Sequence, residues 1–326
     1  MTEKYLVFHV EGGLGKNVAS TAVITHLKKK YNDRKIVVVA SYPEVFLNNE
    51  NIHRVYRVGA TPYFYDDYIH QKDTIVLRKE PYYENNHIMR KTPLYETWFN
   101  MYDIPYNKKE ISPYLPMNGM QEIWSQEWRR EKPILLLQTN GGPLDENMQP
   151  NAYAWTRDMP PAIAEIIVKA AVQKYHIIRV CRPNSYHLEG VERVDAPLNN
   201  FQLFSLVKAS QKRALIDSSL HHAAAAFKIP CTVLWVGTDP KMFGYDIHNN
   251  ICAREPSGNV KRIDSYLFDY DFHGNHHEFP YYSNDVIFDL YSADVSLFND
   301  IFKIRSIKIG FKYPHKFLFV GRLEPV

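Results

Sequence analysis

Residues 5–16, YLVFHVEGGLGK, carry the pattern that decides the fold of the amino-terminal part of the chain. The first six form a short apolar run, as in strands that a sheet buries on both faces, and the glycines after them suit a tight turn. Small and apolar residues then recur at helical spacing over residues 16–31. The run KIVVVA at 35–40 predicts a second buried strand, and residues 52–58 predict a third. Strand, helix and strand in this order predict a parallel sheet with a right-handed crossover.

The same alternation of strands and helices begins again at Pro133. We expect strands at 134–139, 177–181, 214–217 and 231–236, and helices at 160–174, 199–209 and 220–227. The predicted fold class is therefore α/β, with two Rossmann-like domains that face each other across a cleft. We place the first domain at residues 1–120, the second at 121–311, and a tail at 312–326 that packs on one of them. Ligands of such sheets bind beyond the carboxyl ends of the strands.

The stretch between the two regular regions has a weaker pattern. Residues 63–110 are rich in Tyr, Asp, His and Pro, and only residues 94–101 predict a short helix. We expect this stretch to be the irregular half of the first domain. Residues 112–119 contain two prolines and a glycine without periodicity, which is typical of a boundary between domains.

Composition narrows the class of protein. Of the 326 residues 45% are hydrophobic and 23% charged, as in globular proteins, and no apolar run is long enough to span a membrane. The net charge of +3, from 39 basic and 36 acidic residues, does not demand a nucleic-acid partner. The three cysteines, Cys181, Cys231 and Cys252, form no CxxC pair. They fit neither a disulfide framework nor a zinc site, so we expect a cytoplasmic protein.

The turn at residues 11–17, EGGLGKN, is the first candidate for ligand binding. Glycines let the backbone approach a phosphate or an acceptor closely, and the amides at the start of the next helix attract anions. The three glycines are Gly12, Gly13 and Gly15. The turn resembles the phosphate-binding loop of ParA-like ATPases, but Glu11 stands in place of the signature lysine. Asn17 replaces the hydroxyl residue that binds magnesium there. An ATPase is therefore kept as an alternative that these two departures weaken.

The segment LIDSSLHHAAAA at residues 215–226 is the second candidate. A strand ends in Asp217, and two hydroxyl residues, Ser218 and Ser219, lead into a helix that carries His222. Backbone amides, hydroxyl groups and the positive end of the helix dipole suit a diphosphate. The strand at 231–236 then leads into a turn that contains Thr238 and Asp239.

These two segments resemble the heptosyltransferase family of GT-B glycosyltransferases, glycosyltransferase family 9. That family shows Asp-Thr-Gly-Leu-Ser-His-Leu-Ala-Ala-Ala and then Gly-Pro-Thr-Asp-Pro. The matching residues here are Asp217, Leu220, His222, Ala224, Ala225, Ala226, Thr238, Asp239 and Pro240. The run from Arg157 to Pro160 is similar to the Lys-x-Trp-Pro that opens a helix in the family. The resemblance implies the GT-B fold and transfer of a hexosyl, heptosyl or pentosyl group from a nucleotide-sugar co-substrate to a hydroxyl acceptor, with no cofactor and no metal.

The resemblance also assigns roles to individual residues. Residues expected to bind the donor are Arg157, Arg182, Asp217, Ser218, Ser219, His222, Thr238 and Asp239. Arg182 is included because it follows the strand at 177–181 and its planar guanidinium suits phosphate oxygens. The family often has an aspartate base directly after the glycine of the first turn, where this chain has Lys16. We therefore expect Glu11 to act as the base and Lys16 to neutralise the leaving diphosphate or an acidic acceptor. Ser219 in place of a glycine indicates a donor that differs from ADP-heptose.

Several alternatives remain open from the sequence. Adjacent residues on a helix point about 100° apart, so we do not expect His221 and His222 to chelate a metal together. Short acidic and histidine-rich patterns, at 269–271 and 273–278, arise often by chance. Lys16 in the usual base position keeps a catalytically silent nucleotide-sugar binding module possible. The acceptor is left undecided among a glycan, a lipid-linked sugar, a protein and a modified nucleic acid.

Overall fold

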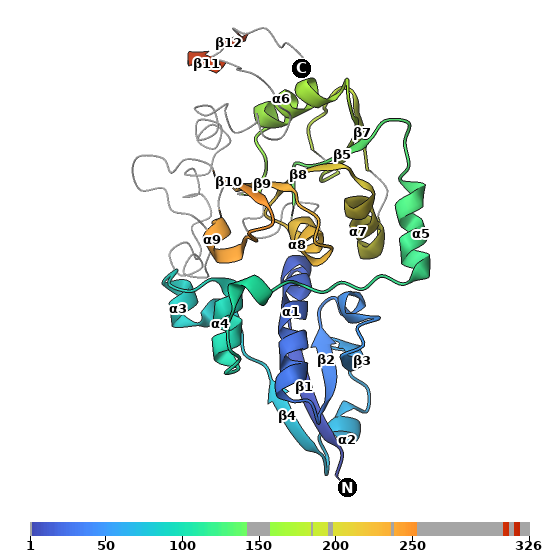
Figure 1. The fold of residues 1–326 in the computed structure, drawn as a ribbon, viewed down its shortest axis with the longest axis vertical. Helices are drawn as coiled ribbons and strands as arrows, with labels where there is room; N and C mark the ends of the chain where they lie inside the picture. Colours follow the sequence, from blue (N-terminus) through green and yellow to red (C-terminus); the bar gives the residue numbers. More distant parts are fainter. Residues whose placement is uncertain are drawn as a thin grey trace.

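The computed structural model describes residues 2–141, 157–183, 185–194, 198–235, 238–252, 309–312 and 316–319. Two parallel sheets dominate it, and they lie one above the other in Figure 1 with helices α1 and α8 where they meet. The predicted α/β class is confirmed. Within the described residues, no helix has the length and apolarity needed to span a membrane.

The first sheet has the strand order β3-β2-β1-β4, and all its strands run parallel. Its strands are β1 (Lys4–Val10), β2 (Lys35–Ala40), β3 (Ile52–Arg57) and β4 (Asp73–Leu77). Side chains alternate across β1: Leu6 and Phe8 enter the main core with helix α1 (Leu14–Lys30). Tyr5 enters a smaller cluster on the opposite face with Tyr68 of α2 (Phe64–Tyr68). The sequence pattern did not predict β4, which lies inside the stretch expected to be irregular.

The second sheet has the order β10-β9-β8-β5-β6-β7, again with every strand parallel. Its strands are β5 (Ile134–Gln138), β6 (His176–Val180), β7 (Val191–Arg193), β8 (Lys212–Ile216), β9 (Thr232–Trp235) and β10 (Asn249–Cys252). Helix α6 (Pro161–Ala171) shares a buried cluster with one face of this sheet. Side chains of α7 (Asn200–Ala209) and α8 (Ser219–Ala226) join the main core with its other face. The four strands and three helices predicted here are confirmed to within a few residues, and β7 and β10 are additional.

Shorter elements connect and flank the two sheets. They are η1 (Pro43–Phe46), η2 (Pro81–Tyr83), α3 (Asn85–Ile88), α4 (Leu94–Met101), η3 (Lys108–Glu110), α5 (Gly119–Glu127), α9 (Pro240–Phe243) and the antiparallel pair β11 (Ile309–Lys312) and β12 (Lys316–Phe319). The predicted helix at 94–101 is confirmed as α4. Residues 313–315 and 320–326 lie outside the described residues, so the packing of the tail stays a prediction.

The main core joins the two sheets. It contains Phe8 of β1, Leu136 of β5 and Ala223 of α8, each with no exposed surface. Near the expected boundary at residue 120, Asn118 and Gln121 form a capping box that begins helix α5. Burial of one continuous apolar cluster holds the two sheets against each other. The domain boundaries themselves remain a prediction.

Candidate functional site

The first turns of helices α1 and α8 touch each other. A Cβ added to Gly15, in the first turn of α1, would lie 2.9 Å from Cδ2 of His222 and 3.4 Å from Cα of Ser219. Two helix amino termini, each with a positive dipole end, therefore meet at one point. No side chain caps α1, whose N-cap residue is Gly13. The two segments that the sequence treated as competing sites thus lie in contact, and binding of an anion between them stays a prediction.

The start of α8 is held by a reciprocal cap. The Ser218 hydroxyl accepts from the Leu220 amide at 3.2 Å and donates to Oε1 of Gln138 at 2.6 Å. Nδ1 of His221 in turn accepts from the Ser218 amide at 3.1 Å. The hydroxyl expected to contact a diphosphate is therefore engaged in shaping the loop. Gln138 was not predicted, although it ends the strand before a loop where we expected a ligand.

His222 is buried beside this cap and belongs to a chain of hydrogen bonds. Its Nδ1 lies 2.6 Å from the Tyr245 hydroxyl, and that hydroxyl lies 2.6 Å from the hydroxyl of Tyr95. Burial lowers the pKa of His222 well below its ordinary value, and the neighbouring His221 and His248 lower it further. The imidazole of His222 is therefore neutral. No feature of the sequence connected Tyr95 or Tyr245 with this site.

The two predicted arginines have different surroundings. Arg157 donates from Nη1 to the carbonyl oxygen of Asp217 at 3.3 Å, so it lies over the loop before α8. Arg182 instead forms a largely buried ion pair with Asp158, with Nη2 and Oδ1 3.0 Å apart. Burial raises the pKa of Asp158, and the Arg182 guanidinium opposes that rise. The charge of Arg182 is matched by a carboxylate, whereas no described carboxylate pairs with Arg157. Binding of the donor by either arginine stays a prediction.

Asp239 joins two parts of the fold. It caps α9 by accepting from the Lys241 amide at 2.9 Å, and its other oxygen lies 2.6 Å from Nη2 of Arg90. Arg90 follows α3, so the ion pair links the two chain regions on either side of the site. Thr238, next to it, is buried. The structure thus gives Asp239 a structural task, and its contact with a donor remains a prediction.

Lys16, in the first turn of α1, is buried against an acidic partner that the sequence did not reveal. Its Nζ forms an ion pair with Glu80 and lies 5.4 Å from the centre of the Tyr82 ring. Burial lowers the pKa of Lys16, and the Glu80 carboxylate opposes the change. Glu80 was missed because it follows β4, the strand that the sequence pattern did not predict.

Glu11 lies at the carboxyl ends of β1 and β4. About half of its side chain, 49%, is exposed, and its Oε1 is 3.2 Å from Nε2 of His9 and 3.4 Å from Nη2 of Arg78. A second carboxylate, that of Glu80, borders the same glycine turn through Lys16, whose Cδ would contact a Cβ on Gly12 at 3.4 Å. Two carboxylates therefore flank the turn, where the sequence had indicated one.

The side chain of Asn17 is fully buried and supports the turn. Its Nδ2 donates to the carbonyl oxygens of Gly12 and Gly13, and its Oδ1 accepts from the Tyr42 amide at 3.3 Å. Because Asn17 is bound to the backbone and Lys16 to Glu80, neither matches the magnesium and phosphate ligands of an ATPase loop. The ATPase alternative is not favoured.

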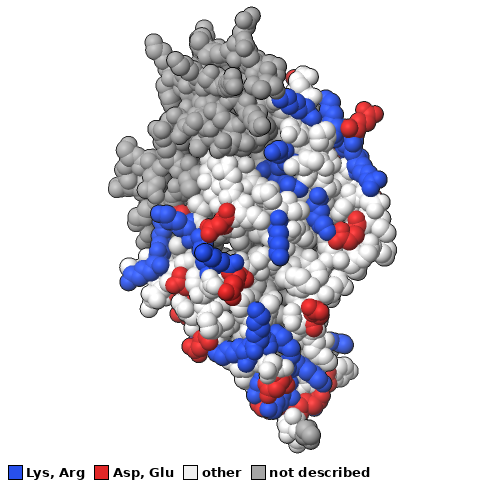
Figure 2. Space-filling view, in the orientation of Figure 1, with Lys and Arg blue, Asp and Glu red and all other residues white. Residues whose placement is uncertain are grey.

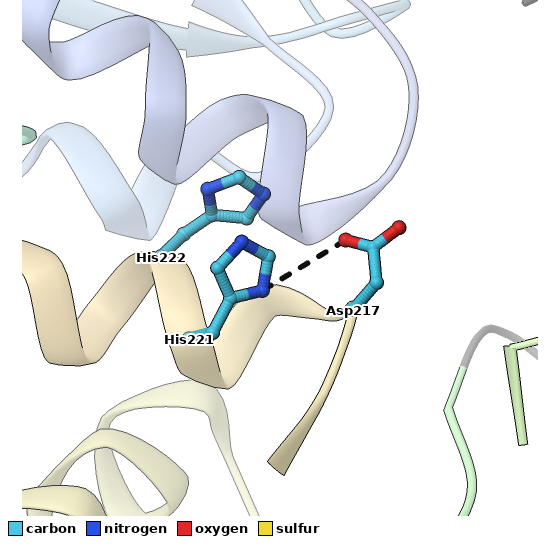
Figure 3. Close-up of side chains that lie close together, drawn as sticks. All are labelled: Asp217, His221 and His222. Carbon is cyan, nitrogen blue, oxygen red and sulfur yellow. Dashed lines mark ion pairs between the residues drawn. The ribbon is translucent and has the colours of Figure 1, made fainter. Parts of the chain in front are cut away.

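Asp217, His221 and His222 form the group drawn in Figure 3, in which the two imidazole rings lie side by side. One ligand atom from each residue lies within 4.8 Å of the others, and the ring centres of the histidines are 4.0 Å apart. The expectation that adjacent histidines point apart is wrong here, because rotation about the side-chain bonds brings the rings together. Nδ1 of each ring is nevertheless engaged in a hydrogen bond. The absence of a metal remains a prediction, and the patterns at 269–271 and 273–278 lie outside the described residues.

The chain has a fold in common with glycosyltransferases. A family 9 glycosyltransferase from Veillonella parvula superposes with a TM-score of 0.59 and 11% identity, covering 92% of this chain and 98% of the other. ADP-heptose LPS heptosyltransferase II of E. coli gives 0.55 at 13% identity, covering 91% and 99%. The iron-containing heptosyltransferase TibC of enterotoxigenic E. coli, solved with ADP-D-beta-D-heptose, gives 0.52 at 13% identity, covering 79% and 66%. By sequence, the chain matches no family model and no curated protein. The likeness establishes the fold, GT-B, which the motif at residues 217–226 had indicated.

Proposed function

We propose that this protein is a glycosyltransferase that moves a sugar from a nucleotide-sugar donor to a hydroxyl group of an acceptor, without a metal or cofactor. The observation that carries the proposal is the meeting of two helix amino termini at Gly15 and His222. A leaving nucleoside diphosphate develops negative charge, and fixed amides and helix dipoles stabilise such charge without reorganising. The GT-B fold supports the proposal because a heptosyltransferase structure with that fold superposes on nearly the whole chain.

The proposed reaction is a direct displacement. The acceptor oxygen attacks the anomeric carbon, the bond from that carbon to the diphosphate oxygen breaks, and the hydroxyl proton passes to a carboxylate. Glu11 is the proposed base, because its carboxylate is half exposed at the edge of the glycine turn. Glu80 is the second candidate for the base, on condition that its ion pair with Lys16 opens first. Arg157 and the amides that follow Asp217 are the proposed donor-binding groups.

The partners proposed follow from this assignment. Residues 1–120 would contribute the acceptor side and residues 121–311 the donor side. The face in Figure 2 carries Lys and Arg interspersed with Asp and Glu, so that face gives no support to a nucleic-acid acceptor over a glycan, lipid-linked sugar or protein. Cys231 is a buried free thiol in the described structure, which is consistent with the proposed cytoplasmic location.

A thermal-shift screen against UDP-, GDP-, CMP-, TDP- and ADP-sugars tests the proposal, since a ligand that binds the native state raises the melting temperature. One nucleotide class should raise the melting temperature of the wild-type protein, and Arg157→Ala should weaken that response. Lys29→Ala is the matched control, because Lys29 is exposed at the opposite end of α1. No response to any nucleotide sugar, or an equal response in both variants, contradicts the proposed site. Radiolabelled sugar transfer to a cell extract then separates an enzyme from a silent binding module.

A further inference from the structure

We propose that Tyr95 and Tyr245 are positioning residues that hold His222 in the tautomer with its proton on Nε2. His222 then enters the candidate site as a neutral hydrogen-bond donor. The tautomer itself follows from the described contacts alone. The hydrogen bond from Nε2 to a phosphate oxygen of the donor rests on the proposed function.

The three residues come from separate elements and meet in the interior. Tyr95 lies on α4, Tyr245 lies two residues after α9 ends, and His222 lies on α8. Their exposed fractions are 7%, 8% and 6%, so water has little access to any of them. The two hydrogen bonds of the chain are each 2.6 Å long. Such a chain of buried groups has few alternative arrangements.

The number of available protons decides which group donates in each of these two hydrogen bonds. Among the described residues, the Tyr95 hydroxyl has a hydrogen bond to the Tyr245 oxygen alone. Buried hydroxyl protons are nearly always donated, so Tyr95 donates to Tyr245, and Tyr245 must donate its own proton to Nδ1 of His222. The reverse direction leaves the buried Tyr95 proton without an acceptor, at a cost of about 1–3 kcal/mol.

The protonation states support this count. Burial lowers the pKa of His222 well below its ordinary value and raises that of Tyr245 well above its own. The imidazole is thus neutral with a single N–H, and both phenols keep their protons. A neutral imidazole that accepts at Nδ1 carries its proton on Nε2.

The donor edge of the ring faces the junction of the two helices. Cδ2 and Nε2 of His222 lie 2.9 Å and 3.4 Å from the position that a Cβ of Gly15 would occupy. The fixed N–H therefore lies beside the uncapped amides of α1. An oxyanion bound between the two amino termini would accept from these amides and from Nε2 together.

Long-range ¹H–¹⁵N spectra of histidine-labelled full-length protein read the tautomer directly, with the His222 signal assigned by its loss in His222→Gln. The wild-type spectrum should show His222 neutral and protonated on Nε2. Tyr245→Phe removes only the hydroxyl, so the Nδ1-protonated form should become populated while the aromatic packing is kept. Tyr68→Phe is the control, because it removes a half-buried hydroxyl bonded to Tyr56 on the far face of the first sheet. A wild-type His222 protonated on Nδ1, or a tautomer unchanged by Tyr245→Phe, overturns the inference.

Titration with inorganic pyrophosphate tests the functional consequence separately. Tyr245→Phe should weaken pyrophosphate binding about tenfold to a hundredfold, the loss of roughly one hydrogen bond to a charged group, and Tyr68→Phe should not. If the wild-type tautomer is as inferred but neither pyrophosphate nor any nucleotide sugar binds, the proposed function fails while the positioning role of the tyrosines stands. Equal pyrophosphate affinity of wild type and Tyr245→Phe shows that the Nε2 proton does not serve the anion.

Discussion

Gly15 lies on α1 and His222 on α8, and these helices pack against different sheets. A Cβ on Gly15 would nevertheless approach the imidazole Cδ2 of His222 to 2.9 Å. Real Cβ atoms do not come this close, so the contact requires glycine. The approach brings the amino terminus of α1 against that of α8. Most of the proposed chemistry depends on this single contact.

We expect Gly15→Ala to separate the two helix ends. An alanine favours a helix by up to about 1 kcal/mol over glycine, which would raise stability if the site had room. The close approach to His222 should outweigh this gain, so we expect a lower melting temperature and at least tenfold weaker pyrophosphate binding. Gly119→Ala, at the open first position of α5, is the control, and it should lower neither the melting temperature nor the affinity for pyrophosphate. Unchanged pyrophosphate binding in Gly15→Ala would show that the helix contact does not form the site.

The Lys16–Glu80 ion pair should be strongly coupled. Lys16 has a side chain only 8% exposed and Glu80 one 28% exposed, so removing either partner leaves a charge in a poorly solvated place. Breaking a buried pair costs about 3–5 kcal/mol, and the partial exposure of Glu80 should reduce this to roughly 2–3 kcal/mol for Lys16→Met. The double variant Lys16→Met with Glu80→Gln should recover part of the loss. Urea denaturation of all four proteins measures the coupling, and additive losses would contradict it.

The base is distinguished by comparing two carboxylate variants. If Glu11 accepts the proton, Glu11→Gln should lower kcat about 10²- to 10⁴-fold with little change in the KM for the donor. Glu80→Gln should then lower kcat much less. The control is Glu3→Gln, because Glu3 pairs with Lys35 and Lys72 at the opposite, amino-terminal end of β1. A larger loss of kcat in Glu80→Gln would transfer the role to Glu80.

Two buried histidines should make the protein sensitive to mild acid. Burial lowers the pKa of His87 and of His248 to about 4 from the ordinary 6.5. One nitrogen of each ring is bonded to a carbonyl oxygen, while Nε2 of His87 and Nδ1 of His248 are buried without a partner among the described residues. A second proton has no acceptor there, so the folded state disfavours the charged ring.

The sign of the pH effect follows from these values. In the unfolded chain these histidines take up protons below pH 6.5, whereas in the folded chain they do so only near pH 4. Their contribution to the free energy of unfolding is therefore complete above pH 6.5 and is lost as the pH falls towards 4. The loss should approach about 3 kcal/mol for each histidine. Urea denaturation at a series of pH values measures it, and His248→Asn should flatten the slope. A free energy of unfolding that does not change over this range would refute the prediction.

The sequence predicted some residues of the candidate site and missed others. Asp217 to His222 and the glycines of the first turn were identified because a strand, a turn and a helix start have local signatures. Glu80, Gln138, Tyr95 and Tyr245 were missed, since each acts through a partner distant in the chain. Arg182 was predicted to bind the donor, but its ion pair with Asp158 was not predicted.

The sequence by itself determined the α/β class, the parallel strands and the two helix starts, because apolar periodicity and glycine turns act over neighbouring residues. Only the tertiary structure decided that the starts of α1 and α8 contact each other. That outcome depends on the burial of an apolar core shared by the two sheets, and on a glycine small enough to let α1 reach His222. Contacts of this kind are set by packing between distant segments, which no local pattern encodes.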